Sequence, residues 1–268
     1  MKNLFSFLFC FFVFAIQVQA PFMQAQLMTV LQVEKAVVLK GDFAKKDDFK
    51  KVPVENYHQA LTVNKFSEIN IDLPDNYKKI VENVLQEMPK KHLSSLERII
   101  AEPGSNARRG LASFKSIYLG VDVMQNDAEF RRVFIHEIGH VIDLGVLTAS
   151  NKEIASDFRD GVNIIYQSDP SLLFYELCWL DEYTPNGNCN DLDFVSEYSQ
   201  TDVFEDFAES YLLFVENNAS FLEMTQESEV LAKKYNFLAQ YVFSNNFKKT
   251  PLVTLPRGER VWDLTLVN

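Results

Sequence analysis

The spacing of apolar residues predicts four helices along the chain. The first lies between Pro74 and Pro89, where apolar residues recur three and four positions apart. The second begins at Asn126, which together with Glu129 fits a capping box, and continues as an apolar-rich helix to Gly145. Two further helices are predicted over residues 203–216 and 227–243.

Two short apolar runs predict buried strands. They cover residues 96–101 and 116–121, and Gly104 and Gly110 mark turns between them. Strands and helices in this order, with no internal repeat, predict a single α+β domain over residues 73–268. Residues 21–72 mix short apolar alternations with a charged stretch, and we expect an N-terminal extension or a propeptide-like region there.

The first twenty residues have the pattern of a signal peptide. Lys2 precedes an apolar run over residues 4–16, and polar and small residues follow up to Ala20. This run is shorter than the ~20 residues that a membrane-spanning helix needs, although a membrane anchor is the alternative. We therefore expect residues 1–20 to be removed on export, the mature protein to be secreted or periplasmic, and no transmembrane segment to remain.

Charge and cysteine content narrow the class of protein. The formal net charge of −11, without a basic stripe to offset it, argues against nucleic acid as a partner. Once Cys10 leaves with the signal peptide, Cys178 and Cys189 remain, separated by a segment rich in turn-forming residues. In an oxidising compartment this pair predicts one disulfide, the alternative being two unpaired thiols.

Residues 136–140 read HEIGH, an HExxH motif inside the second predicted helix. His136 and His140 share one helix face, so both imidazoles can reach one ion, and Glu137 points at the remaining coordination position. Zinc held in this way acidifies a water molecule, and the adjacent carboxylate takes its proton as the water attacks a carbonyl. The motif therefore predicts one zinc ion per chain and a hydrolase.

A catalytic zinc ion normally has three protein ligands, so a third ligand is needed. Glu205 and Glu209 lie four apart on the helix predicted at 203–216, and such a like-charge pair costs stability unless a cation compensates it. We expect Glu205 to be the third ligand, and its alternative role is a capping box with Asp202. Asp143, three residues after His140, is expected to orient an imidazole.

The combination of motifs resembles the catalytic domain of the anthrax lethal factor family of peptidases. That family has HExGH, then a tyrosine seven residues before a glutamate ligand in an ExFAE helix. This chain has HEIGH at 136–140, Tyr198, and EDFAE at 205–209. The resemblance covers residues 75–245 and implies a zincin-like fold, with a small twisted sheet over the HExxH helix and a mainly helical lower lobe that supplies Glu205.

The same resemblance assigns roles by position. It implies a zinc metallopeptidase of the gluzincin type, with Glu137 as general base, Tyr198 supporting the transition state and Glu209 supporting a metal ligand. The implied zinc ligands are His136, His140 and Glu205. A rim strand that pairs with substrate is implied at Arg109, Gly110, Leu111 and Ala112.

We therefore expect an exported zinc endopeptidase that acts on a protein or peptide. Two alternatives stay open at this point: an inactive binding module on the same scaffold, and a metal-dependent hydrolase of a non-peptide amide. The chain departs from the family in a longer segment between His140 and Glu205, which contains both cysteines and is expected to border the cleft.

Overall fold

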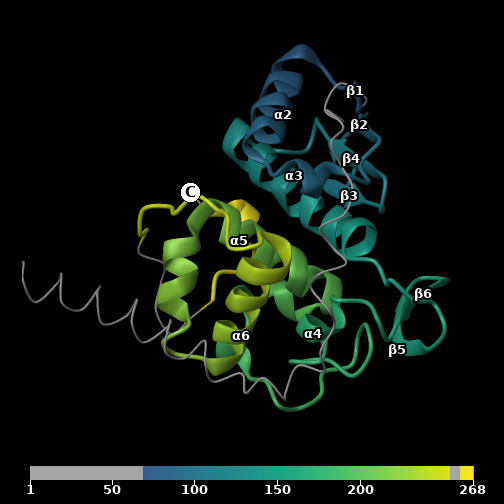
Figure 1. Cartoon of the computed structure of the whole chain (residues 1–268). Coiled ribbons are helices and arrows are strands. Elements are labelled where there is room, and N and C mark those ends of the chain that lie inside the picture. Colours follow the sequence, from purple (N-terminus) through teal and green to yellow (C-terminus); the bar gives the residue numbers. More distant parts are fainter. Residues whose placement is uncertain (1–68, 254–259, 268) are drawn as a thin grey trace, which may run out of the picture. The chain divides into compact units, whose positions relative to one another are not determined.

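The computed structural model describes residues 69–253 and 260–267, all of which belong to one compact unit. Its architecture is mixed α+β, with a four-stranded sheet, a two-stranded hairpin and several helices (Figure 1). The expected signal peptide and residues 21–68 of the expected N-terminal extension lie outside the described residues.

The four-stranded sheet has the strand order β1-β2-β4-β3. Strands β1, β2 and β4 are parallel, whereas β3 pairs antiparallel with β4 and forms one edge of the sheet. The strands predicted at 96–101 and 116–121 are confirmed as β2 and β4, and β1 falls within the segment expected to be an extension. The strands are β1 (Asn70–Asp72), β2 (Arg98–Glu102), β3 (Gly110–Ala112) and β4 (Ser116–Gly120).

Two predicted helices pack beside this sheet. Helix α2 (Asp75–Glu87) packs on α3 (Asp127–Val141), and α3 in turn contacts β3 and β4 (Figure 1). Nearly every residue of α3 after its first turn is buried, because the helix lies between the sheet and the other helices. At Ile142 the α-helix changes into one turn of π-helix, η4 (Ile142–Val146).

The remaining helices form an aromatic-rich cluster around α5 (Val203–Met224), which packs against α3 and α6. Helix α5 is longer than the predicted 203–216 because it continues past a non-helical residue, Asn217. The Asn218 amide donates to the carbonyls of Phe214 and Lys248, which compensates the interruption. The other helices are α4 (Leu172–Tyr175), α6 (Glu229–Phe237) and the π-helical η7 (Leu238–Val242). Short 3-10 turns are η3 (Lys90–Leu93), η5 (Asp191–Asp193), η6 (Tyr198–Gln200) and η8 (Leu264–Leu266).

The long segment between α3 and α5 contains a hairpin and a disulfide. Strands β5 (Ala155–Asp160) and β6 (Asn163–Tyr166) are joined through Gly161, whose positive φ of 58° suits glycine. The predicted bond between Cys178 and Cys189 is confirmed. Structural disulfides persist in oxidising compartments, so this bond fits an exported protein. Within residues 69–253 and 260–267, no helix is both long and apolar enough to cross a membrane.

Candidate metal centre

Helix α3 carries the two histidines at its buried end. The Asn126 side chain caps the helix by accepting from the backbone N–H groups of Ala128 and Glu129, as the sequence predicted. The Glu129 carboxylate accepts from the N–H of Gln125, one residue before the cap, and also from Arg109. The cap fixes where α3 begins, and the helical period then places His136 and His140 on one face.

Three potential ligand atoms converge between α3 and α5. The Nε2 atoms of His136 and His140 are 3.2 Å apart, and Oε2 of Glu205 lies 3.0 Å and 3.6 Å from them, respectively. Donor atoms about 2.0–2.2 Å from a tetrahedral ion lie roughly 3.3–3.6 Å from one another. The observed triangle is therefore close to the one that a single ion requires, and His136, His140 and Glu205 could hold a metal.

The Glu205 carboxylate has a buried oxygen that faces both imidazoles. Its Oε2 atom is buried and forms no hydrogen bond within the described part of the chain, although both imidazoles are near. Burial disfavours the charged carboxylate, but the two histidines outweigh it and lower the pKa of Glu205. A metal ion held by the two imidazoles would compensate the charge of this buried carboxylate in the same way.

Glu209 fixes the orientation of the first histidine. Its Oε1 lies 3.0 Å from Nδ1 of His136, and its Oε2 accepts from the backbone N–H of Leu264 at 2.9 Å. With the Nδ1 proton donated to this fully buried carboxylate, the lone pair of Nε2 points towards Glu205. Burial disfavours the charged imidazole, but Glu205 and Glu209 outweigh it and raise the pKa of His136. Without a metal ion, a proton on Nε2 bridges the 3.0 Å to Glu205, and a bound metal ion would take the place of that proton.

The close approach of α3 and α5 depends on two small residues. A Cβ atom at Gly139 would lie 3.0 Å from the Cα of Ala208 and 3.3 Å from the Cβ of Tyr211. Glycine inside a helix costs about 1 kcal/mol relative to alanine, so its presence between the two histidines indicates a packing requirement. The apolar stripe of the predicted helix at 203–216 includes Ala208, but its contact with Gly139 was not predicted, although the unfavourable glycine was the available signal.

Glu137 is buried beside the edge strand β3 and lines the same cleft as the three ligands. Burial raises its pKa, while His140 and His136 act in the opposite direction. Its Oε2 atom has no hydrogen-bond partner among residues 69–253 and 260–267. A Cβ atom at Gly110 would lie only 2.1 Å from Oε1 of Glu137, so the strand leaves room for this carboxylate only because residue 110 is glycine.

We expect Gly110→Ala to lower kcat/KM by about 100-fold if Glu137 is the general base, because a displacement of about 1 Å has an effect of this size. The added methyl group overlaps the carboxylate and its Cγ and Cδ atoms, so the flexible side chain must move. The fold and metal content should be unchanged, as circular dichroism and elemental analysis would show. A variant with wild-type kcat/KM would contradict the close packing of Gly110 on Glu137.

Tyr198 enters the cleft from η6, directly before the α5 helix. Its ring centroid lies 6.2 Å from that of His136, and its backbone N–H donates to the carbonyl of Trp262 at 2.7 Å. Partial burial and the neighbouring Glu205 carboxylate raise the pKa of its hydroxyl. The hydroxyl therefore stays protonated and able to donate across the pH range in which proteins function.

Asp143 forms its hydrogen bonds with partners other than the imidazole that we expected. Its two oxygens accept from the hydroxyls of Ser171 and Tyr175, each at 2.6 Å, and burial raises its pKa to about 7. Its oxygens are occupied by two hydroxyls of the segment at α4, about thirty residues later, and the spacing within α3 does not predict this contact. Within the described part of the chain, it is Glu209, and not Asp143, that forms a hydrogen bond with a histidine of this site.

Residues 109–112 of the expected rim strand line a cleft of about 510 Å³ together with the histidines, Glu137, Tyr198 and Glu205. Arg109 itself contacts Asp263, Thr265 and Glu129. From the long segment between the ligand helices, Asp160 of the hairpin also lines the cleft, whereas Phe174 and Trp179 are buried in the helical cluster. Asp263 and Thr265, which also line the cleft, were not anticipated from the sequence.

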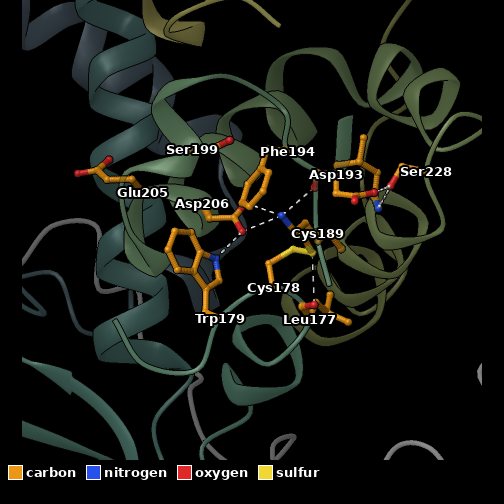
Figure 2. A network of polar contacts seen from close by, with 12 residues as sticks. Leu177, Cys178, Trp179, Cys189, Asp193, Phe194, Ser199, Glu205, Asp206 and Ser228 are labelled. Atoms are coloured by element: carbon orange, nitrogen blue, oxygen red, sulfur yellow. Dashed lines mark hydrogen bonds and ion pairs between the residues drawn. A yellow bond between two sulfur atoms is a disulfide. The ribbon is translucent and has the colours of Figure 1, made fainter. Parts of the chain in front are cut away.

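Asp206, which directly follows Glu205 in α5, points in a different direction from Glu205 (Figure 2). Figure 2 shows Asp206 within a buried polar network and Glu205 pointing away from it. Asp206 accepts from Nζ of Lys234 through both oxygens, at 2.7 Å each, and from Nε1 of Trp179 at 3.0 Å. Trp179 directly follows the disulfide residue Cys178, so the network joins the disulfide loop, α6 and the first turn of α5. The turn that carries Glu205 is thereby held in place from its opposite side.

Comparisons of the chain with family models, with curated proteins and with solved structures found no match.

Proposed function

We propose that this protein is a zinc metallopeptidase that cleaves within peptide chains, with His136, His140 and Glu205 as the metal ligands. The observation that carries the proposal is the triangle of their three donor atoms beside Glu137, whose buried Oε2 has no hydrogen-bond partner in the described part of the chain. Two imidazoles and one carboxylate form a ligand set that catalytic zinc uses in peptidases, and the set leaves a position open for chemistry. This ligand set and the surrounding α+β architecture agree with a zincin-like fold.

Glu137 and Tyr198 have different roles in the proposed reaction. Zinc, when bound, supplies a Lewis acid that polarises the scissile carbonyl and acidifies water. Glu137 accepts the proton from the attacking water and delivers it to the departing amine nitrogen, a double task that its raised pKa suits. Tyr198 donates its hydroxyl proton in a hydrogen bond to the carbonyl oxygen as negative charge develops there.

The edge strand explains why a peptide is the proposed substrate. The carbonyl of Arg109 accepts from Gly120, and the N–H of Ser113 donates to Ser116. Because hydrogen-bonding residues alternate along an antiparallel pair, the backbone groups of Gly110 and Ala112 point away from β4. An extended peptide in the cleft would add to this edge as a further strand, which fits cleavage within a chain. We place this activity in a secreted or periplasmic protein, in agreement with the disulfide.

The proposal is tested by incubating the purified protein with a complex peptide mixture and identifying new termini by mass spectrometry. We expect cleavage by the zinc-loaded protein, none after removal of the metal with a chelator, and recovery when zinc is added back. Loaded protein that produces no new termini in peptides or unfolded proteins would contradict the peptidase proposal. Cleavage that persists after complete metal removal would contradict the role of the metal.

A further inference from the structure

The last described segment of the chain, residues 260–267, lies against the metal centre although it follows Glu205 by more than fifty positions in the sequence. Its short helix η8 contacts both ligand helices, α3 and α5. Asp263, Leu264 and Thr265 are buried, while the side chains of Trp262 and Leu266 are exposed. The inward-facing part of this C-terminal segment therefore consists of an acidic residue and its two successors.

Asp263 bonds the guanidinium of Arg109, which in turn connects three elements of the structure. One carboxylate oxygen accepts from the backbone N–H and the hydroxyl of Thr265, which caps η8. The other accepts from Nη2 of Arg109, on the rim of the cleft next to Gly110. Arg109 also donates to Thr265 at 2.6 Å and to Glu129 at 3.3 Å, in the first turn of α3. The rim strand, the ligand helix and the C-terminal segment are thus tied together.

The helix η8, which Asp263 caps, also connects to the candidate metal ligand His136 through Glu209. The N–H of Leu264, the first residue of η8, donates to Oε2 of Glu209 at 2.9 Å, and Oε1 of Glu209 holds Nδ1 of His136 at 3.0 Å. A continuous chain of hydrogen bonds therefore leads from the C-terminal segment to a metal-binding imidazole. Partners of this kind orient a ligand ring, and their loss typically costs about 10- to 100-fold in metal affinity.

The same segment also supports Tyr198. The carbonyls of Val261 and Trp262 accept from the backbone N–H groups of Glu197 and Tyr198, at 2.9 and 2.7 Å. We propose that the C-terminal segment is a positioning element of the metal centre, and that Asp263 is the residue that holds it there. This inference rests on the proposed function, but the effect of substituting Asp263 on metal affinity is measurable whether or not the protein cleaves peptides.

The experiment compares Asp263→Ala, Asp263→Asn and Leu266→Ala with the wild-type protein. Leu266→Ala changes an exposed side chain in the same segment and serves as the matched control. Asparagine caps helices about as well as aspartate but lacks the charge that Arg109 contacts, so Asp263→Asn keeps a folded protein available if the alanine variant does not fold. The readouts are zinc affinity by competition with a chelator, Tm of the metal-free protein, and kcat on a cleaved peptide.

We expect Asp263→Ala to weaken zinc binding by about 10- to 100-fold and to lower kcat, with a smaller effect in the same direction for Asp263→Asn. Leu266→Ala should match the wild-type protein in all three measurements. The proposal is overturned if the folded Asp263 variants bind zinc with wild-type affinity, even when their Tm is reduced, because Asp263 then only stabilises the fold. A wild-type protein that binds zinc without cleaving peptides refutes the proposed function and leaves the affinity comparison decisive for Asp263.

Discussion

Replacing Glu137 by glutamine is expected to lower the rate of peptide hydrolysis by about 10²- to 10⁴-fold while zinc binding remains unchanged. Glutamine keeps the size and position of the side chain beside Gly110 but cannot accept the proton of the attacking water. The three ligand atoms belong to other residues, so the metal should stay in place. Initial rates measured on one cleaved peptide, together with the zinc content of both proteins, provide the comparison.

A control for this substitution is Glu216→Gln, which changes a partly buried carboxylate that pairs with Arg131 and is not among the residues that line the cleft. It should affect stability more than the chemical step. If Glu137→Gln kept more than about a tenth of the wild-type rate, that rate would lie above the range for loss of a general base, and another group would have to take the proton.

Replacing Lys234 by methionine is expected to lower the free energy of unfolding by about 3–5 kcal/mol. Lys234 is fully buried, and its ammonium group contacts both oxygens of Asp206, the carbonyl of Asp193 at 3.0 Å and the ring of Phe194. Burial raises the pKa of Asp206, and Lys234 is the principal group that opposes this. Methionine keeps an unbranched chain but leaves the carboxylate without its cation.

The matched control is Lys233→Met, one residue away on the exposed face of α6, which should change stability by less than about 0.5 kcal/mol. Denaturant unfolding, followed by fluorescence, measures both variants. A double variant, Lys234→Met with Asp206→Met, should recover much of the loss, because an apolar pair replaces the buried charges. Equal stability of the Lys233 and Lys234 variants would contradict the account of the buried pair.

Local sequence patterns were sufficient to predict α3 and the start of α5, the helices that contain the candidate ligands. The cap at Asn126 and the apolar period located α3, and the four-residue spacing placed both histidines on one face. Asp202 caps α5 by accepting from Phe204 and Glu205, whereas no bond from the Glu205 side chain back to the Asp202 N–H is found among the described residues, and this side chain reaches both imidazoles instead. These features depend on interactions between residues close in sequence, which is why the sequence predicts them.

Features that arise from packing between distant segments were not predicted. Asp143 accepts from Ser171 and Tyr175, which lie about thirty residues later in the chain, and no spacing rule within α3 anticipates these partners. The contacts of Asp263 and Leu264 join the end of the chain to residues more than fifty positions earlier, and this short segment has no periodic pattern. The strand β3 was indicated only by the family resemblance, because three residues carry little pattern of their own.

The proposed function depends most directly on a metal ion held by His136, His140 and Glu205. Elemental analysis of protein purified without chelators, for the wild type and for Glu205→Ala, tests this claim. We predict one zinc ion per wild-type chain, and a strong loss of zinc from a Glu205→Ala variant that remains folded. Wild-type protein that contains no zinc and takes none up on reconstitution, or a Glu205→Ala variant with wild-type affinity, would contradict it.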